Sequence, residues 1–340
     1  MVNDKSPTSL LLPSIFYLLP DFIMAKKVAV VAVGGNSLIK DEKHATVSDQ
    51  YLAAVETMKH ITSMLEKGWE VVITHGNGPQ VGFILARSEA AEKHLGMHPV
   101  PLDSCGADSQ GAIGYNFQQA LTNEFRRRGI NKNAVTVVTR VLVDAADPAF
   151  KKPTKPIGSF MTQEKATEKK EKEGWDIVED AGRGWRRVVA SPEPKEILEE
   201  DAIKSLIKSG FVVIAVGGGG IPVVSVKEKN IIKGTAAVID KDYASSLLAS
   251  NIKADLLLIS TAVEKVYINF GKPDQKAIDK MTVAEAKKYI EEGHFKPGSM
   301  LPKVKAIIKF LEKGGKQGLI TDPAHIPQAL DGKTGTWIVP

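Results

Sequence analysis

Three long apolar runs in this chain each end directly in a glycine-rich turn. The runs and their turns are 27–33 (KVAVVAV) before Gly34-Gly35-Asn36, 70–74 (EVVIT) before His75-Gly76-Asn77-Gly78, and 211–216 (FVVIAV) before Gly217-Gly218-Gly219-Gly220. Continuous β-branched and aliphatic runs are typical of strands buried on both faces of a parallel sheet. They predict an α/β fold in which the carboxyl ends of several strands meet at one edge.

The glycine turns also indicate a function for that edge. A glycine turn lets a ligand approach the backbone, where side chains would block it and bare N–H groups can bind an anion. Three such turns at three strand ends predict one shared crevice for phosphate or carboxylate.

Composition narrows the class of protein. The chain has 340 residues, 43% hydrophobic and 25% charged, which is ordinary for a globular protein of one large or two medium domains. A net charge of +5 without a basic arm makes nucleic acid an unexpected partner. Cys105 is the only cysteine, which excludes an intramolecular disulfide and fits the reducing cytoplasm. No Cys/His cluster has zinc-site spacing, so no dedicated metal site is expected.

Residues 1–24 are treated apart from the fold. The apolar stretch 10–22 is broken by Pro13 and Pro20 and is too short to span a bilayer, so no membrane partner is expected. It lacks the cleavage site of a signal peptide and the arginines of a transit peptide. An N-terminal extension is favoured, with a targeting segment as the alternative.

From residue 25 onward, helical and strand patterns alternate. Helices are expected at 49–66 (Leu52, Val55, Met58, Ile61 and Leu65 on one face), from Pro79, at 109–128, 195–209, from 242, from the capping box at 282–285, and at 299–314. Strands are expected at 134–143, 255–260, 317–321 and 335–339, with a hairpin at 223–232. This alternation predicts a mostly parallel sheet with helices on both faces.

Residues 147–194 interrupt the alternation. Prolines cluster at 148, 153 and 156, and a highly charged stretch runs from 163 to 174. The segment is interpreted as an inserted subdomain, and its charged stretch as a solvated helix face. The run Arg126-Arg127-Arg128 is likewise interpreted as a solvated helix end and not a binding patch.

Familiar nucleotide fingerprints do not fit. Gly332-Lys333-Thr334 resembles the end of a P-loop, but the required preceding glycine and following helix are missing. Gly76, Gly78 and Gly82 nearly form a dinucleotide fingerprint, but Glu92, about twenty residues on, lies within a helix. A dehydrogenase is therefore not expected.

Three lysines occupy unusual local positions. Lys303 is in the first turn of its helix, Lys241 lies between Asp240 and Asp242, and Lys155 lies between two prolines. Each alone is more often a surface lysine. With three anion-binding turns, however, they suggest phosphoryl transfer, which needs positive charge around the transferred group. Asp242 could hold two of the ammonium groups in position.

Two other side chains have chemical potential. His75 is a possible general base, although a histidine at a strand end more often makes a structural hydrogen bond. Cys105 is interpreted as a buried small hydrophobe and not a nucleophile.

The motifs together resemble those of the carbamate kinases, members of the amino-acid-kinase family. In family order they are GGNS at 34–37, HGNGPQVG at 75–82, QGAIGY at 110–115, KKPTKPIG at 151–158, DAGRGWRRVV at 180–189, GGGGIPVV at 217–224, VIDKDYAS at 238–245 and GHFKPGSMLPK at 293–303. Each is weak alone, but the ordered set covers residues 26–339.

The resemblance implies a fold and separate binding regions for the two substrates. It implies a three-layer αβα sandwich with a central, mainly parallel sheet of about eight strands and a protruding inserted subdomain. Residues 25–215 would form the carbamate-binding lobe, 147–194 a mobile lid inserted in it, and 216–340 the nucleotide-binding lobe. A homodimer is implied as well.

The resemblance also assigns residues to roles. The reaction would be reversible phosphoryl transfer between ATP and carbamate, run toward ATP in fermentative arginine breakdown, with Mg²⁺ riding on nucleotide oxygens. The implied catalytic residues are Lys155, Lys241, Asp242 and Lys303. The implied substrate-binding residues are Gly34, Gly35, Asn36, Gly76, Asn77 and Gly78. The implied nucleotide-binding residues are Gly217, Gly218, Gly219, Asp240, Ala262, Val263, Tyr267 and Met300.

One difference within the family favours carbamate. Acetylglutamate and aspartate kinases resemble one another in carrying a lysine just before the first glycine pair, where this chain has Val31-Ala32-Val33. Ser37 and Arg140 depart mildly from the carbamate kinase pattern. The alternatives are another acyl-phosphate kinase and, from a different class, a nucleotide-binding sensor without turnover.

Overall fold

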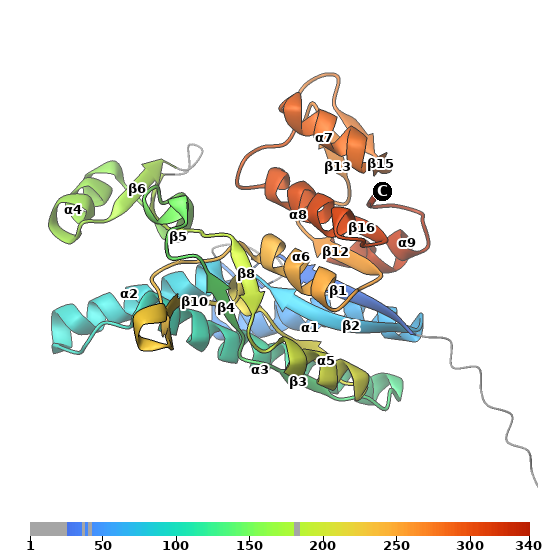
Figure 1. Ribbon diagram of the computed structural model, residues 1–340, viewed down its shortest axis with the longest axis horizontal. Helices are drawn as coiled ribbons and strands as arrows, with labels where there is room; N and C mark the ends of the chain where they lie inside the picture. The colour runs from blue at the N-terminus through green and yellow to red at the C-terminus, as the bar shows by residue number, and fades with distance from the viewer. Residues whose placement is uncertain (1–25, 36–37, 40–42, 180–183) are drawn as a thin grey trace, which may run out of the picture.

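The computed structural model describes residues 26–35, 38–39, 43–179 and 184–340. Its centre is an eight-stranded sheet (Figure 1). In spatial order the strands are β15 (Lys280–Thr282), β17 (Thr336–Val339), β16 (Gln317–Thr321), β12 (Leu256–Ser260), β1 (Lys27–Val33), β2 (Trp69–His75), β9 (Val212–Ile214) and β3 (Ala134–Thr136). The strands from β16 to β3 are parallel, whereas β17 and β15 run the opposite way.

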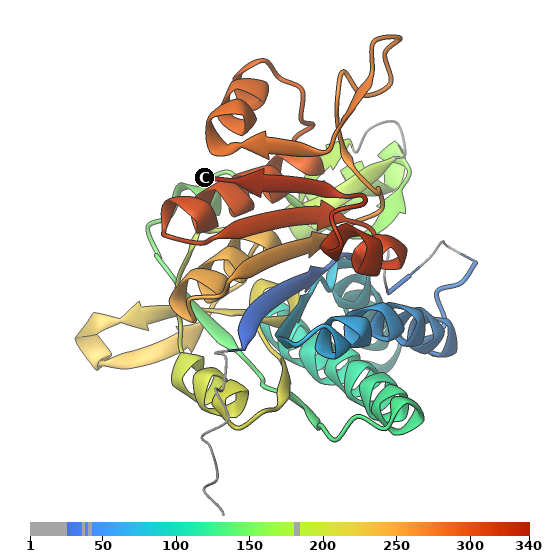
Figure 2. The same ribbon diagram turned by 90° about the vertical axis from the view of Figure 1, so that its right-hand side faces the viewer.

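Helices cover both faces of this sheet (Figure 2). One face carries α1 (Val47–Glu66), α3 (Leu102–Arg128) and α9 (Ile326–Leu330); the other carries α5 (Glu200–Lys208), α6 (Lys241–Asn251), α7 (Val283–Glu291) and α8 (Met300–Glu312). Strand β1 contributes to both cores by alternation: Val30 and Ala32 join the α6/α8 core, while Ala29, Val31 and Val33 join the α1/α3 core. The predicted three-layer αβα fold is confirmed.

Two smaller sheets extend from this body. One consists of β11 (Ile231–Gly234), β10 (Ile221–Val226), β4 (Arg140–Val143) and β8 (Pro194–Ile197). The other consists of β5 (Lys155–Met161), β7 (Trp185–Val189) and β6 (Asp176–Glu179), and with α4 (Gln163–Glu173) it forms the predicted inserted subdomain, which stands off the body in Figure 1. The remaining elements are α2 (Gly78–Leu95), the hairpin of β13 (Val266–Ile268) and β14 (Lys276–Ile278), and the short 3₁₀ turns η2 (Pro148–Phe150), η3 (Gly217–Gly219), η4 (Lys227–Lys229) and η5 (Pro323–His325).

The inserted subdomain rests on α2 through a close backbone approach. A Cβ added to Gly82 of α2 would lie 2.7 Å from the Cα of Gly158 in β5. Gly158 itself has φ +72°, a conformation that favours glycine. The two glycines thus let β5 lie directly against the helix.

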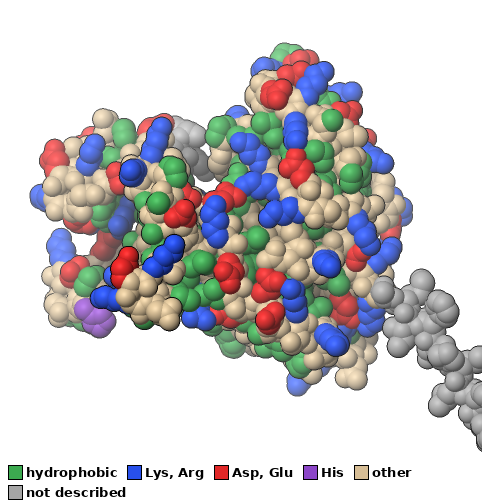
Figure 3. Space-filling view, viewed as in Figure 1, with side chains coloured by type: hydrophobic (Ala, Val, Ile, Leu, Met, Phe, Trp, Pro, Cys, Tyr) green, Lys and Arg blue, Asp and Glu red, His purple; other side chains and the backbone are tan. Residues whose placement is uncertain are grey.

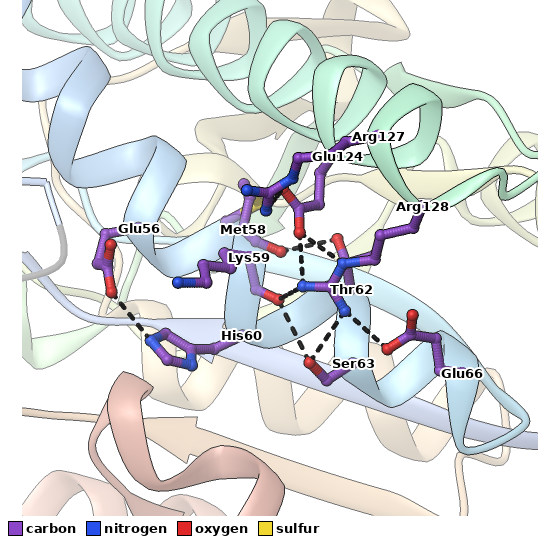
Figure 4. A network of polar contacts seen from close by, with 10 residues as sticks. All are labelled: Glu56, Met58, Lys59, His60, Thr62, Ser63, Glu66, Glu124, Arg127 and Arg128. Atoms are coloured by element: carbon purple, nitrogen blue, oxygen red, sulfur yellow. Dashed lines mark hydrogen bonds and ion pairs between the residues drawn. The ribbon is translucent and has the colours of Figure 1, made fainter.

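Helices α1 and α3 are joined by a polar network around Arg128 (Figure 4). The Arg128 guanidinium donates to the Glu124 carboxylate at 2.5 Å, to the Glu66 carboxylate at 2.7 Å and to the Lys59 carbonyl at 2.8 Å. Only 18% of its side chain is exposed. Arg128 is more than the solvated helix end that was predicted, because it bonds to groups of both α1 and α3.

Local signals in the sequence locate several elements correctly. The capping box at Thr282 opens α7, with the hydroxyl accepting from the Glu285 N–H at 3.2 Å. Proline lies at the start of α2, and η4 forms the turn between β10 and β11. These predictions succeed because each depends on a few neighbouring residues.

Three boundaries were predicted wrongly. The expected strand 134–143 is two strands in different sheets, because the chain leaves the central sheet between them and Thr139 N–H bonds to Gln110 Oε1 at 2.8 Å. The helix expected from 195 begins at Glu200, since 194–197 pairs with β4. The helix expected from 109 begins at Leu102, directly after Pro101.

The exposed side of α1 was also misjudged. Leu52 is 63% exposed and Val55 36% exposed, although both were placed on the same face as Met58. At about 100° per residue, Leu52 lies about 120° around the helix from Met58. The buried stripe instead includes Ala54, Met58 and Ile61.

Candidate active site

A cleft of about 920 Å³ opens at the carboxyl ends of β1 and β2, between the body and the inserted subdomain. Figure 3 shows basic side chains along this boundary on one face of the molecule. The predicted site residues that line the cleft are Gly35, Gly76, Asn77, Gly78, Lys155, Gly218, Asp240, Lys241, Asp242 and Lys303. Ten residues predicted from motifs spread over some 270 positions therefore meet around one cavity.

The first two glycine turns lie side by side. Val33 and His75 are partners in the β1–β2 ladder, and the Gly76 N–H donates to the Val33 carbonyl at 3.0 Å. A Cβ on Gly35 would meet nothing within 4 Å, so its backbone faces open space. Gly34 is not part of the lining, and a Cβ there would lie 2.9 Å from the Ser260 carbonyl oxygen. Asn36 and Ser37 lie outside the described residues.

The third glycine turn forms η3, and its glycines are needed first for packing. An added Cβ would lie 2.5 Å from His75 Nε2 at Gly217, 2.1 Å from Asn77 Nδ2 at Gly218 and 2.5 Å from the Ile239 carbonyl at Gly219. Of these three glycines, only Gly218 lines the cleft. The turn therefore closes the floor of the site by close contact with the second turn.

Two side chains that were given no role hold this third turn in place. Gln110 Nε2 donates to the Gly217 carbonyl at 2.9 Å, and Thr139 Oγ1 accepts the Val216 N–H at 3.0 Å. Val216 has φ +53°, an uncommon conformation for a β-branched residue, so its backbone needs such support. The motif at 110–115 contained a signal for Gln110, but nothing in the sequence indicated its partner.

Two lysines share one buried carboxylate. Asp242, 3% exposed, pairs through Oδ1 with Lys241 Nζ and through Oδ2 with Lys303 Nζ at 3.0 Å. Asp240 caps α6 by accepting the Asp242 N–H at 2.9 Å. Both ammonium groups are thereby held in place at the cleft.

The protonation states follow from this pairing. Burial raises the pKa of Asp242, but the ammonium groups of Lys241 and Lys303 and their hydrogen bonds outweigh burial, so the pKa lies well below its usual 3.8. Burial lowers the pKa of Lys241 below 10.5; Asp242 opposes this shift and Lys303 adds to it. The cluster as a whole keeps an excess of positive charge toward the cavity.

Lys155 reaches the body from the inserted subdomain. It begins β5, and its Nζ bonds to Asp240 Oδ2 at 2.6 Å. The three predicted lysines are therefore linked through two adjacent carboxylates at the start of α6. Such an array can bind an anion and neutralise charge on a transferring phosphoryl group.

Four other nucleotide-binding candidates do not line this cleft. Ala262 and Val263 follow β12, Tyr267 is in β13 and Met300 begins α8. None of the four is part of the lining described above.

His75 and Cys105 are buried and do not line the cleft. The His75 ring Nδ1 lies 2.9 Å from the Gly76 carbonyl, so it carries the proton and donates. Burial lowers the pKa of His75 to about 4, aided by the charge of Lys241 and opposed by the bond to Gly76. Burial raises the pKa of Cys105 to about 11, with smaller contributions from Asp108 and Asp103. Their structural interpretation is confirmed.

The described part of the chain has neither a cluster of metal-ligating side chains nor a membrane-spanning helix. Within 26–35, 38–39, 43–179 and 184–340, three or more His, Cys, Asp or Glu side chains nowhere gather as metal ligands. No helix in the same ranges combines the length and apolar character needed to cross a bilayer.

Fold and site together define an α/β protein with a lysine-lined cleft at the carboxyl edge of its sheet. The profile of the amino acid kinase family matches residues 27–322. The carbamate kinase-like protein YahI of Escherichia coli is 53% identical over 315 residues, covering 92% of this chain and 99% of that protein. The carbamate kinase of Thermococcus kodakarensis is 48% identical over 314 residues, with coverages of 92% and 99%.

A solved structure agrees. Carbamate kinase from Giardia lamblia bound to AMP-PNP matches with a TM-score of 0.84 and 42% identity over 93% of this chain and 99% of that one. The chain therefore belongs to the amino acid kinase family of phosphotransferases, in the group that contains the carbamate kinases.

Proposed function

We propose that this protein is a carbamate kinase that catalyses ATP + carbamate = ADP + carbamoyl phosphate. The observation that carries the proposal is the Lys241–Asp242–Lys303 cluster facing a cleft that Lys155 enters from the other side. The high identity to carbamate kinases over nearly the whole chain supports carbamate as the substrate.

The reaction requires little covalent chemistry from the protein itself. In the ATP-forming direction, a β-phosphate oxygen of ADP attacks the phosphorus of carbamoyl phosphate, and the P–O bond to the carbamoyl group breaks to release carbamate. Lys241 and Lys303 would neutralise the equatorial oxygens, and Lys155 the bridging oxygen. Asp242 would be a positioning residue, because its two carboxylate oxygens are each engaged by one of these ammonium groups.

The two substrates would occupy neighbouring parts of the site, in the cleft and beside it. Gly34, Gly35, Asn36, Gly76, Asn77 and Gly78 would surround carbamate. Gly217, Gly218, Gly219, Asp240, Ala262, Val263, Tyr267 and Met300 would hold the nucleotide. The lobes would be 25–215 and 216–340, with 147–194 closing over them as a lid that excludes water.

Magnesium would be carried by the nucleotide. Both carboxylates in the lining, Asp240 and Asp242, already accept from lysines, which leaves them poorly suited to form a metal cage. Mg²⁺ arriving with the nucleotide would supply further charge neutralisation. The physiological direction we propose is ATP formation in fermentative arginine breakdown, in the cytoplasm.

The ATP-forming assay tests this function. The purified protein is incubated with ADP, Mg²⁺ and carbamoyl phosphate, and ATP is measured against a protein-free control. Acetyl phosphate, N-acetylglutamate and aspartate are offered in parallel. ATP from carbamoyl phosphate alone is expected; ATP from another acyl phosphate would favour a different kinase, and nucleotide binding without turnover would favour a sensor.

Lys241→Ala is the sharpest single substitution. Because Lys303 still pairs with Asp242, we expect a folded protein whose kcat falls by about 10²–10⁴. Lys305→Ala is the matched control, since Lys305 is exposed on α8 two residues from Lys303. Near-normal turnover by Lys241→Ala would show that the lysine is misassigned.

We also propose a homodimer. The edge strand β3 and helix α3 border a hollow of about 500 Å³ lined in part by Tyr115 and Val138, which are 64% and 53% exposed. Covering such apolar side chains with a second copy would be favourable. Light scattering after gel filtration should give twice the chain mass, and Tyr115→Asp should shift it toward the monomer. A wild-type mass of one chain at micromolar concentration would contradict the dimer.

A further inference from the structure

Asn77 lines the cleft, but its side chain does not cap the helix that it begins. It is the N-cap residue of α2, where the side-chain oxygen of an asparagine ordinarily accepts an N–H of the first helical turn. Asn77 makes no such bond, and in the part of the chain that the structure describes its Oδ1 accepts no hydrogen bond. Because the residue is only 6% exposed, its oxygen is an unused acceptor in a largely buried side chain at the cleft.

A buried serine fixes the orientation of the Asn77 amide. Asn77 Nδ2 donates to Ser109 Oγ at 2.8 Å, and Ser109 Oγ in turn donates to the Gly106 carbonyl at 2.7 Å. Ser109 lies in α3, is fully buried and is not part of the cleft lining. Since the one hydroxyl proton is engaged by Gly106, the serine oxygen can only accept from Asn77. Ser109 therefore selects the amide nitrogen and leaves the amide oxygen without a partner.

The third glycine turn packs against the same amide. A Cβ added to Gly218 would lie 2.1 Å from Nδ2, 2.4 Å from Cγ and 2.6 Å from Oδ1 of Asn77. The amide thus lies directly on the Gly218 backbone, and both residues line the cleft. The hydrogen bond to Ser109 and this contact together hold the side chain in one orientation before any ligand binds.

Asn77 adjoins the glycine on which Lys241 packs. A Cβ added to Gly76 would lie 3.5 Å from Lys241 Cδ and 3.8 Å from the backbone nitrogen of Gly35, and all of these residues line the cleft. A ligand that satisfies both Lys241 and Asn77 Oδ1 needs a negative charge and an N–H donor. Carbamoyl phosphate has both, whereas acetyl phosphate has a methyl group in place of the amino group.

We propose that Asn77 Oδ1 accepts a hydrogen bond from the amino group of the carbamoyl substrate, and that Ser109 is the positioning residue that keeps this oxygen available. The proposal rests on the proposed function for the identity of that substrate. The second N–H of the Asn77 amide is also without a partner among the described residues, but only Oδ1 can accept from an amino group. An analogue without that amino group would leave the acceptor unpaired, so the site would discriminate against acetyl phosphate.

Steady-state kinetics of single and double variants test the positioning role in the full-length protein. Without the serine hydroxyl the amide can turn over, so Ser109→Ala should raise KM for carbamoyl phosphate about fivefold while KM for ADP stays within about twofold. Asn77→Ala should raise it at least as much. The double variant should be no worse than Asn77→Ala, because Ser109 acts through Asn77. Ser104→Ala is the matched control, an exposed serine of the same helix. Additive effects in the double variant, or an equal rise in KM for ADP, would overturn the proposal.

A binding measurement separates this inference from the proposed activity. Thermal unfolding is followed with phosphonoacetamide, which carries an amide NH₂ group, and with acetonylphosphonate, its methyl ketone counterpart. Stronger stabilisation by phosphonoacetamide is expected for the wild type and Ser104→Ala, and equal stabilisation by the two compounds for Ser109→Ala and Asn77→Ala. The same preference in all four proteins, or no preference in the wild type, would overturn the role of Asn77. The expected preferences without turnover by the wild type would overturn only the carbamate kinase activity.

Discussion

At the scale of single residues, burial decides what a side chain can do. His75 and Lys241 are neighbours in the site, but His75 is fully enclosed and bonded to its own turn, whereas Lys241 reaches the cleft. The His75 and Phe117 rings pack in a T-shaped arrangement, with their centres 5.6 Å apart. The histidine is thus a neutral part of the core that supports the second glycine turn.

The depressed pKa of His75 makes stability depend on pH. Its pKa is about 4 in the folded protein against 6.5 for the free side chain, so the unfolded chain binds the proton more tightly. The stabilisation is fully present above pH 6.5 and is lost as pH falls from 6.5 toward 4, by up to about 1.4 kcal/mol per pH unit. Urea unfolding at several pH values measures this slope. His75→Gln should flatten it, whereas the exposed His98→Gln should not; equal slopes in all three would refute the assignment.

At the scale of elements, individual side chains and close backbone contacts join neighbouring helices and strands. Arg128 joins the carboxyl end of α3 to α1, and Gly82 with Gly158 joins α2 to β5. The Glu124 carboxylate, which burial alone would give a raised pKa, has a lowered one because Arg127 and Arg128 bond to it. Removing Arg128 would leave the buried negative charge of Glu124 with less compensating positive charge.

Arg128→Ala should therefore destabilise the fold without touching the cleft. We expect a loss of about 2 kcal/mol in the free energy of unfolding, because several charge-assisted hydrogen bonds disappear while Glu124 stays buried. Urea denaturation measures the loss of stability, and unchanged KM values would show that the cleft is unaffected. Arg126→Ala is the control, since Arg126 is exposed on the same helix; a similar loss in both variants would argue against the network.

At the scale of the whole molecule, the site is assembled from parts that fold on different elements. The inserted subdomain supplies Lys155 and Arg186, the first two strands supply the glycine turns, and α6 and α8 supply the remaining cations. The ion pair between Lys155 and Asp240 bridges subdomain and body. If Lys155 has its proposed role, turnover depends on a contact that contributes little to folding.

Lys155→Met should separate these two contributions. The pair is partly exposed, at 31% and 16%, so its loss should cost at most about 1 kcal/mol of stability. We expect kcat to fall about 10²-fold or more, because a charge near the bridging oxygen is removed. Lys152→Met, exposed in the same segment, should keep normal turnover. A large drop in melting temperature with retained kcat would reverse the interpretation.

The sequence by itself determined what depends on neighbours along the chain. A few adjacent residues are enough to predict each local feature. These features are the buried strand runs, the glycine turns, the capping box at Thr282 and the amino ends of α2 and α8. The motifs also named the lysines of the cleft. Those signals were enough for the α/β class and for the three lysines that line one cleft.

Tertiary structure decided what depends on segments far apart in the chain. Residues 134–143 split between two sheets because Gln110 and other distant groups bind the backbone there. Whether Arg186 or Arg187 lines the cleft depends on which face of β7 is turned toward it, and a pattern of two adjacent arginines is the same either way. Long-range packing chose between arrangements that the local sequence left equivalent.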